Sequence, residues 1–294
     1  MSEMPLMKAI VATTFATLIA CGSLPVHAAK VDVPLPVEVK SAGFLTVGIN
    51  CTYPPAGFVG IDGKPSGYEY TLVKRIAEFA LGTGDGLRTQ CVNDSNRIPF
   101  LQSGKIDLIL ASLAYTPARA EQVDYSQPIW VSNLQLIVPK DSKINEYADL
   151  AGKTVVTPTG STYQTWLQKC YPQANLATVQ TAAEGATMLT QRRTDAFAYI
   201  DVYGFNFAQQ QKNFKVVGTL AASAIQGVGV KKANKPMLDW INAVLEQMRA
   251  EDAFFKAFSE QVKDPAFVAK YRPIVPGPSV KLDYSKSGAL DCLK

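Results

Sequence analysis

The chain has 294 residues, of which 47% are hydrophobic and 18% are charged, and its formal net charge is +4 at pH 7. This composition is typical of a globular protein and excludes a disordered chain or one made of membrane spans. The basic residues are spread along the chain in runs no longer than a dipeptide such as Arg192-Arg193, which disfavours nucleic acid as a partner.

An export segment is expected at the N-terminus. Lys8 precedes the apolar stretch AIVATTFATLIA, which is too short to cross a bilayer comfortably. We predict a signal peptide over residues 1–28, cleavage after Ala28 and a periplasmic mature protein. The alternative is a lipoprotein box at LIAC, which would leave Cys21 as a lipid-anchored N-terminus.

Strands and helices alternate through the first half of the chain. Strands are expected over 44–50, 86–92 and 105–112, and helices over 67–81 and over a short segment that ends at Gly104. The run over 105–112 is continuously apolar, as in strands that are buried on both faces of a parallel sheet. This alternation predicts an α/β fold.

A second α/β unit follows. It contains a strand, turn and helix over 153–171, a helix and strand over 182–201, and further strands over 214–220 and 224–232. The last helices, over 236–262, have no sheet of their own and are expected to pack back on the first unit. We therefore predict a first lobe over 43–139 and 229–277, a second lobe over 140–228, crossings near Val138 and Val228, and a tail over 278–294. Two lobes joined in this way leave a cleft, which is a default ligand site.

The five cysteines indicate disulfides. Cys21 belongs to the export segment, and the other four are an even number in an oxidising compartment. Three pairings are possible, and we favour Cys51 with Cys91 because both lie near strand ends of the first lobe, which leaves Cys170 with Cys292. A metal site is the alternative, but no two cysteines are close in the sequence.

The single histidine limits the chemistry of the folded part. His27 lies in or next to the export segment. Ser-His-Asp triads, Cys-His pairs and zinc-histidine sites are therefore excluded, whereas carboxylates, lysines and tyrosines remain available. We expect no metal and no cofactor.

Five segments resemble one family in their order along the chain: LTVGIN, YPP, GKPSGYEYTLVKRIA, SGKIDLILASLAYTPARAEQVDYSQP and LAGKTVVTPTGST. The resemblance is to the periplasmic solute-binding proteins of polar amino acid ABC transporters (bacterial extracellular solute-binding proteins, family 3), and it covers about residues 43–275. It implies the two-lobed type II periplasmic-binding-protein fold. It also implies a small amino acid or related zwitterion as ligand, an ABC permease in the inner membrane as partner, and a monomer.

The resemblance implies that Arg119 binds the ligand α-carboxylate bidentately, and its planar guanidinium matches a carboxylate. The alternative is a surface ion pair with Glu121 or Asp124. Ser112, at the end of a buried strand, is expected to offer its hydroxyl and backbone N–H to the same carboxylate. The family often has another hydroxyl at the position of Ala114.

The second lobe is expected to contribute Ser161 and Thr162, which precede a helical stretch and contact the carboxylate on closure. The alternative for both is helix capping. Asp201, at the carboxyl end of a strand, is the candidate acceptor for the α-ammonium. In relatives this aspartate often falls one residue earlier, where the chain has Ile200, and the alternative is that Asp201 begins the next helix.

Tyr53 and Phe58 are expected to form walls of the site, with core packing as the alternative for each. Specificity is expected to depend on Asp94 and Arg97. Relatives that bind acidic amino acids resemble this chain at Arg97, whereas Asp94 suits a cationic side chain or neutralises Arg97 in an internal pair.

The leading prediction is therefore a solute-binding component of an ABC importer, not an enzyme. The alternative is an exported enzyme on the same scaffold, of the dehydratase or cell-wall lyase type, with Glu69 or Asp201 as acid or base. A sensor module would need a transmembrane segment, and no sufficiently long apolar run follows residue 30.

Overall fold

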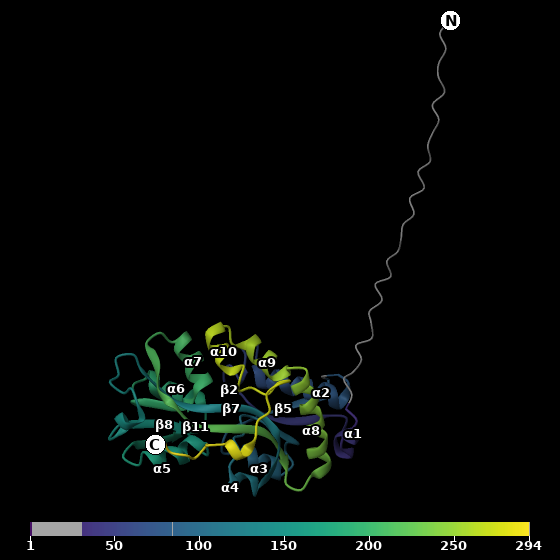
Figure 1. Cartoon of the computed structure of the whole chain (residues 1–294), viewed down its shortest axis with the longest axis horizontal. Helices are drawn as coiled ribbons and strands as arrows, with labels where there is room; N and C mark the ends of the chain where they lie inside the picture. Colours follow the sequence, from purple (N-terminus) through teal and green to yellow (C-terminus); the bar gives the residue numbers. More distant parts are fainter. Residues whose placement is uncertain (2–30, 84, 294) are drawn as a thin grey trace.

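The computed structural model describes residues 1, 31–83 and 85–293 (Figure 1). The predicted cleavage site after Ala28 and the alternative lipid anchor at Cys21 lie outside the described residues. Among the helices that are described, none combines the length and the apolar character needed to cross a bilayer.

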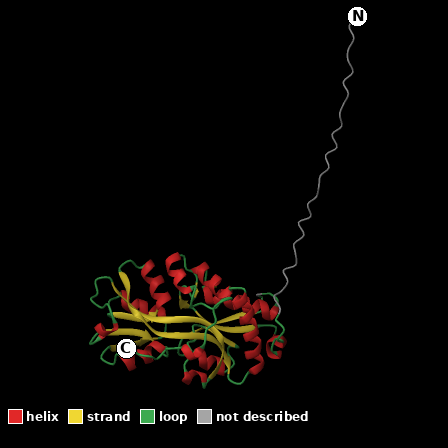
Figure 2. Ribbon diagram, viewed as in Figure 1, coloured by secondary structure: helices red, strands yellow, loops and turns green. Residues whose placement is uncertain are grey.

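One eight-stranded sheet runs through the length of the molecule, with helices on both sides (Figure 2). Its strand order is β5-β1-β6-β11-β7-β10-β8-β9. The strands are β1 (Leu45–Asn50), β5 (Leu87–Val92), β6 (Leu108–Leu110), β7 (Val123–Pro139), β8 (Thr154–Pro158), β9 (Asn175–Val179), β10 (Ala196–Ile200) and β11 (Phe214–Lys231). A small second sheet contains β2 (Thr52–Tyr53), β3 (Gly57–Val59) and β4 (Pro65–Ser66).

The helices follow the predicted order. They are α1 (Val37–Ala42), α2 (Tyr68–Leu81), α3 (Arg97–Gln102), α4 (Pro117–Ala120), α5 (Thr162–Cys170), α6 (Ala182–Thr190), α7 (Asp201–Gln210), α8 (Lys235–Ala250), α9 (Ala253–Gln261) and α10 (Pro265–Tyr271), with 3-10 turns η1 (Tyr147–Leu150) and η2 (Tyr284–Lys286). The expected α/β fold is confirmed. The last helices α8 and α9 pack against α2, beside the strands of the first half of the chain.

The first lobe is built on parallel strands. β1 pairs with β5 on one side and with β6 on the other, and all three residues of β6 are buried. α2 places Leu72, Val73 and Ile76 against this sheet, because residues three and four apart share one face of a helix. The second lobe is built in the same way on β8, β9 and β10, with α5, α6 and α7 packed beside them.

Two long antiparallel strands connect the lobes. β7 and β11 pair from Val123 with Lys231 to Pro139 with Phe214, and the segments predicted as two strands over 214–220 and 224–232 are one strand. The crossing predicted near Val138 requires a correction, because Val138 already pairs with Lys215 beside β10. β7 continues unbroken through both lobes, so the chain enters the second lobe several residues before this point.

Both predicted disulfides are present. Cys51 is bonded to Cys91 and Cys170 is bonded to Cys292. The first joins the end of β1 to the neighbouring β5, and the second joins the end of α5 to the C-terminal segment. These four cysteines are therefore used for cross-links, and the described residues contain no group of three or more potential metal ligands among His, Cys, Asp and Glu side chains.

The C-terminal segment crosses both lobes. The ring of Tyr284 stacks on that of Tyr115 at 4.7 Å between centroids, and its hydroxyl donates to the Ser126 carbonyl at 2.7 Å. Further on, the indole N–H of Trp166 donates to the Asp291 carbonyl at 2.6 Å, next to the disulfide at Cys292. The yellow segment in Figure 1 accordingly runs beside the sheet to its end near α5.

Removal of the disulfide between α5 and the C-terminal segment should lower the stability of the protein. The Cys170→Ser/Cys292→Ser double variant loses a cross-link that constrains a long loop of the unfolded chain. We expect a decrease of about 2–4 kcal/mol in the free energy of unfolding, measured by urea titration. Wild-type protein treated with a reductant provides a second comparison. A variant as stable as the oxidised wild type would contradict the prediction.

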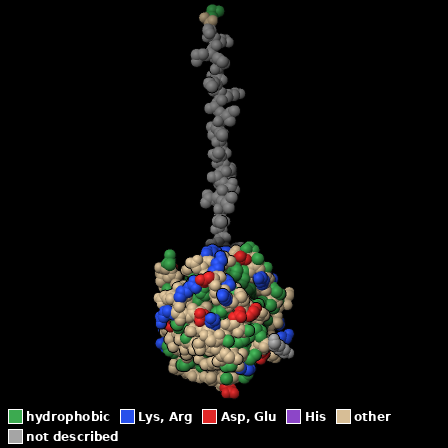
Figure 3. Space-filling model, turned by 90° about the vertical axis from the view of Figure 1, so that its left-hand side faces the viewer, with side chains coloured by type: hydrophobic (Ala, Val, Ile, Leu, Met, Phe, Trp, Pro, Cys, Tyr) green, Lys and Arg blue, Asp and Glu red, His purple; other side chains and the backbone are tan. Residues whose placement is uncertain are grey.

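The second-lobe end of the molecule shows no single-sign charged face. Basic and acidic side chains are interspersed over the surface seen in Figure 3. One of the contacts on this lobe is the exposed ion pair between Arg192 and Asp141, with 3.0 Å between nitrogen and oxygen. A mixed surface of this kind does not provide the concentrated positive patch of a nucleic-acid interface on that face.

Candidate ligand-binding site

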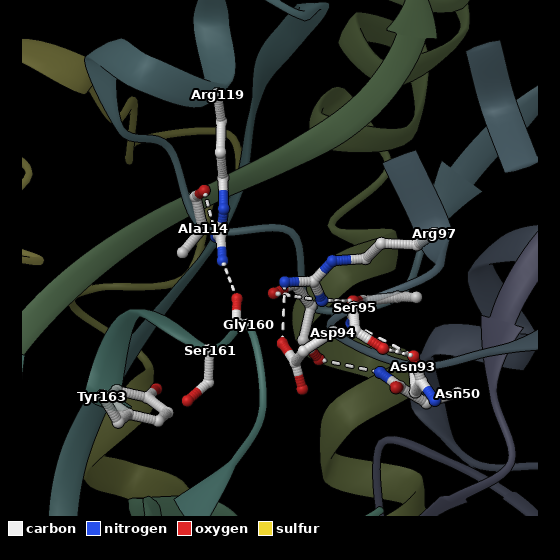
Figure 4. A network of polar contacts seen from close by, with 12 residues as sticks. Asn50, Asn93, Asp94, Ser95, Arg97, Ala114, Arg119, Gly160, Ser161 and Tyr163 are labelled. Carbon is white, nitrogen blue, oxygen red and sulfur yellow. Dashed lines mark hydrogen bonds and ion pairs between the residues drawn. The ribbon is translucent and has the colours of Figure 1, made fainter. Parts of the chain in front are cut away.

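A narrow cavity of about 10 Å³ lies between the lobes. Its lining residues come from both lobes and from a connecting strand: Asn50, Asp94, Arg97, Ser112, Ala114, Arg119, Ser161, Thr162, Tyr163, Tyr199, Ile200 and Gln226. A wider hollow of about 560 Å³ lies on the second lobe, but it is an open surface feature lined by the exposed Asp141 and Arg192. The smaller cavity is the better candidate because charged and polar side chains of both lobes, among them the buried Arg97, converge on it (Figure 4).

Arg119 is a cation at the edge of the cavity. Thr116 caps α4 by accepting from the backbone N–H of Arg119 at 3.3 Å, which places the arginine at the rim of the cavity. Its guanidinium donates to the Ala114 carbonyl at 2.9 Å and to the Gly160 carbonyl at 2.8 Å. Among the described residues no carboxylate pairs with it, and the alternative partner Asp124 pairs with Lys232 instead.

Burial and the neighbouring Arg97 both lower the pKa of the Arg119 guanidinium, to about 10. The guanidinium remains charged at neutral pH, but only two carbonyl oxygens replace the water molecules that would solvate it on an open surface. A carboxylate in the cavity would replace this lost solvation with a charge-assisted hydrogen-bonded pair. The contact with Gly160, which precedes α5, also links the two lobes.

Ser112 has a different role from the one expected. It lies just after β6 with φ of 51°, in the left-handed region that non-glycine residues rarely adopt. Its N–H donates to Glu69 Oε1 at 2.8 Å and its hydroxyl donates to the same oxygen at 2.6 Å. The N–H predicted to bind the ligand carboxylate is therefore already used, although Ser112 does line the cavity.

Glu69 lies behind Asn50 and Ser112 and holds these two cavity-lining residues in place by hydrogen bonds. Asn50 donates from Nδ2 to Glu69 Oε2 and to Ser112 Oγ, both at 3.2 Å. Burial raises the pKa of the Glu69 carboxyl to about 7, against the opposing effect of its hydrogen bonds to Ser112 and Asn50. Glu69 is not among the residues that line the cavity, so we regard it as a residue that positions Ser112 and Asn50.

The Glu69 carboxyl should give the stability a specific pH dependence. Because its pKa is about 7 in the folded protein and 4.5 without burial, the folded state holds a proton between these values that the unfolded state has lost. Its contribution to stability therefore falls as pH rises from about 4.5 to 7, by at most about 3 kcal/mol. Glu69→Gln should flatten the curve of unfolding free energy against pH in this window. Glu260→Gln, at an exposed glutamate, is the control, and equal slopes for Glu69→Gln and wild type would contradict the prediction.

Asp94 and Arg97 form an internal ion pair on the cavity wall. Arg97 Nη2 lies 2.7 Å from Asp94 Oδ1, and Arg97 Nη1 donates to the Ala111 carbonyl at 2.6 Å. The preceding turn is held by the side chains of Asn93 and Asn96, which accept from backbone N–H groups. The alternative of an internal pair is therefore what the structure contains, and Arg97 does not stand free for a second ligand carboxylate.

The second lobe supplies the start of α5. Ser161 is the N-cap, and its hydroxyl accepts from the Gln164 N–H at 3.1 Å. The capping alternative for Ser161 is thus present, while Ser161 and Thr162 both line the cavity as expected. The start of a helix also carries a partial positive charge that favours an anion. This lobe therefore adds to the attraction that Arg119 exerts on a carboxylate.

Asp201 is not part of the cavity, which corrects its predicted role. β10 ends at Ile200, which does line the cavity, and Asp201 begins α7 with 3% of its surface exposed. Its Oδ2 accepts from the Tyr271 hydroxyl at 2.7 Å and from Asn133 Nδ2 at 3.0 Å. Its Oδ1 accepts from the N–H groups of Asn133 and Val202. The carboxylate is therefore saturated and ties α7 and α10 to β7.

The two predicted wall aromatics lie elsewhere. Tyr53 is 1% exposed and packs behind the cavity on Tyr199, with 5.4 Å between ring centroids. Phe58 lines a separate hollow with Ile61 and Gln210. The core-packing alternative applies to Tyr53, and the aromatic wall is made instead by Tyr199 and Tyr163.

The residues that the sequence interpretation missed have recognisable positions. Asn50 ends β1 and Tyr199 lies near the end of β10, so both follow the rule that ligands bind at the carboxyl ends of strands. Gln226 is 3% exposed within an otherwise apolar part of β11, and it donates to Ser132 Oγ at 2.8 Å. A lone glutamine in such a strand was the available signal for it.

Comparison with known proteins supports one family. Residues 45–260 match the family model of the bacterial extracellular solute-binding proteins, family 3. The glutamine-binding protein of Geobacillus stearothermophilus is 30% identical over 200 residues, which are 67% of this chain and 76% of the relative.

Two solved structures are also similar in fold. The cysteine-binding protein from Campylobacter jejuni has a TM-score of 0.75 and 31% identity, with 77% of this chain and 92% of that chain covered. A solute receptor for L-cysteine of Neisseria gonorrhoeae has a TM-score of 0.76 and 28% identity, with 81% and 96% covered. The two-lobed α/β architecture, the interlobe cavity and the family match agree, and the chain belongs to the bacterial extracellular solute-binding proteins, family 3.

Proposed function

We propose that this protein captures a small amino acid in the interlobe cavity and delivers it to the permease of an ABC importer. The observation that carries the proposal is Arg119, a half-buried arginine whose guanidinium has only carbonyl partners among the described residues, in a cavity that both lobes build. The similar proteins named for glutamine and cysteine support an amino acid as the ligand class. We further propose that the protein acts as a monomer in the periplasm after cleavage following Ala28.

Binding is proposed to couple to closure of the lobes. The carboxylate of the ligand would pair with Arg119 from the first lobe and with the start of α5, at Ser161 and Thr162, from the second. A ligand held from both sides favours the closed arrangement by the difference between its affinities for the closed and open forms. The contact of Arg119 with the Gly160 carbonyl is the direct protein link that would accompany this closure.

The enzyme alternative has no support in the cavity. The two carboxylates considered for acid–base catalysis, Glu69 and Asp201, are buried and hydrogen-bonded outside the cavity lining. A general acid or base has to reach the atom whose proton it transfers.

The proposal predicts a ligand-dependent thermal midpoint. The mature protein is heated with a panel of L-amino acids, opines and dicarboxylates, each at several concentrations. A ligand at a hundredfold its dissociation constant that binds only the folded state adds ~2.7 kcal/mol of stability, which is an easily measured shift. We expect a shift with at least one L-amino acid, and a smaller one with its D-enantiomer. A panel in which no amino acid shifts the midpoint would contradict the proposed function.

A further inference from the structure

The cavity contains three charged side chains: Asp94, Arg97 and Arg119. Asp94 is thus the one carboxylate among the described residues that line it. The other two carboxylates near the site are used elsewhere, since Glu69 accepts from Ser112 and Asn50, and Asp201 accepts from Tyr271 and Asn133. Any cationic group of a ligand therefore has a single carboxylate to approach.

The ion pair presents its carboxylate side to the cavity. The Arg97 side chain is 2% exposed and the Asp94 side chain is 15% exposed. Asp94 uses Oδ1 for Arg97, and its second oxygen is drawn without a bond in Figure 4. A carboxylate oxygen accepts about two hydrogen bonds, so this second oxygen is free to accept N–H donors from a ligand.

The Arg119 guanidinium and the backbone of Asp94 both lie beside one residue of the second lobe, Gly160. Arg119 Nη2 donates to the Gly160 carbonyl at 2.8 Å. The backbone of Asp94 packs against the other side of Gly160, where an added Cβ would lie 3.2 Å from the Asp94 carbonyl oxygen.

We propose that Asp94 binds the α-ammonium of the ligand, in place of the aspartate expected at the end of β10, and that the ligand is a small amino acid with an uncharged side chain. This inference rests on the proposed function. A second carboxylate would meet the exposed oxygen of Asp94 rather than the covered guanidinium of Arg97. A basic side chain would need a second carboxylate, and Asp94 supplies the one carboxylate among the described residues that line the cavity.

The experiment compares amino acids with their deamino analogues by isothermal titration calorimetry. The probes are L-alanine with propionate, L-serine with 3-hydroxypropionate, L-cysteine with 3-mercaptopropionate and L-glutamine with 4-carbamoylbutanoate, together with L-glutamate and L-arginine. For wild type we expect at least one uncharged amino acid to bind roughly tenfold or more tightly than its deamino analogue and than the two charged amino acids.

The informative variant is Asp94→Asn/Arg97→Met, which removes both members of the pair and leaves no unpaired buried charge. It should reduce the affinity for the amino acid roughly tenfold or more, with little change for the deamino analogue. Asp141→Asn/Arg192→Met removes an exposed aspartate–arginine pair of the same kind and should keep the wild-type affinities. Asp94→Asn/Arg97→Gln also leaves no unpaired buried charge and keeps a side-chain N–H donor near the Ala111 carbonyl, so it tests the same point if the methionine variant does not fold.

The outcomes separate the two proposals. Equal affinities of wild type for an amino acid and its deamino analogue, or an unchanged amino-group preference in the Asp94 variants, would overturn the role of Asp94. If wild type binds an amino acid and Arg119→Ala does not, the proposed function stands even when the Asp94 variants overturn this inference. Absence of amino acid binding in wild type would overturn both.

Discussion

Arg119→Ala is expected to weaken amino acid binding at least ~30-fold, or about 2 kcal/mol, because it removes one partner of a desolvated charge pair. The guanidinium is buried enough that its pKa falls to about 10, so water does not compete strongly for the ligand carboxylate. Arg119→Lys should recover only part of the affinity, since an ammonium retains the charge without the planar fork. Calorimetric titration of wild type and both variants measures these differences.

Arg192→Ala is the matched control for Arg119. Arg192 is an exposed arginine with a carboxylate partner, Asp141, and it lies far from the cavity lining. Its loss should leave the dissociation constant unchanged. Retention of wild-type affinity by Arg119→Ala, in a variant that unfolds at the wild-type temperature, would rule out the assigned role.

Asp94→Ala is expected to lower the free energy of unfolding by about 3 kcal/mol, because it leaves the Arg97 guanidinium buried without its counter-ion. Arg97 is 2% exposed and would retain only the carbonyls of Ala111 and, at 3.5 Å, Ser112 as partners. Asp94→Ala/Arg97→Met should recover much of the loss, since a neutral side chain of similar length replaces the cation. Urea unfolding of the three proteins measures both effects.

Asp141→Ala supplies the comparison for this stability prediction. The Asp141–Arg192 pair is exposed, and an exposed pair contributes at most about 1 kcal/mol. A cost for Asp94→Ala as small as that for Asp141→Ala would show that Arg97 finds other solvation when its partner is lost.

The elements of this fold were predictable because each depends on local pattern. The apolar run before Ser112 became β6, and the helical spacing of Leu72 and Ile76 became the buried face of α2. The disulfides followed from an even number of cysteines and their positions near strand ends. The crossing near Val138 was placed too late, because β7 keeps the same extended backbone and buried pattern through both lobes.

The candidate site was predictable only in part, because side-chain direction depends on distant partners. Arg119, Ser161 and Thr162 line the cavity as expected. Asp201 does not, since Tyr271 and Asn133, each about 70 residues away in the sequence, hold its carboxylate. Neither partner is visible from the local sequence around a strand end.

The hydrogen bonds of Ser112 were also not predictable from its local sequence, because their acceptor lies on another element. The position of Ser112 after β6 was correctly placed, but its N–H and hydroxyl point to Glu69, which lies on α2. A buried glutamate early in an amphipathic helix was a signal that some polar group of another element had to meet it.

The C-terminal segment gives the molecule a mechanical limit. Tyr284 is anchored on Tyr115 in the first lobe, and Cys292 is bonded to α5 in the second. The chain makes eight residue steps from 284 to 292, which extend at most about 28 Å. The segment is therefore a tether of limited length beside the two connecting strands. While Tyr284 stays in place, this tether limits the distance by which α5 can move away from the first lobe. In a reducing solution only the hydrogen bonds from Trp166 and Lys169 to the Asp291 and Leu290 carbonyls hold the segment on α5, so the limit is weakened without any change in the residues that line the cavity.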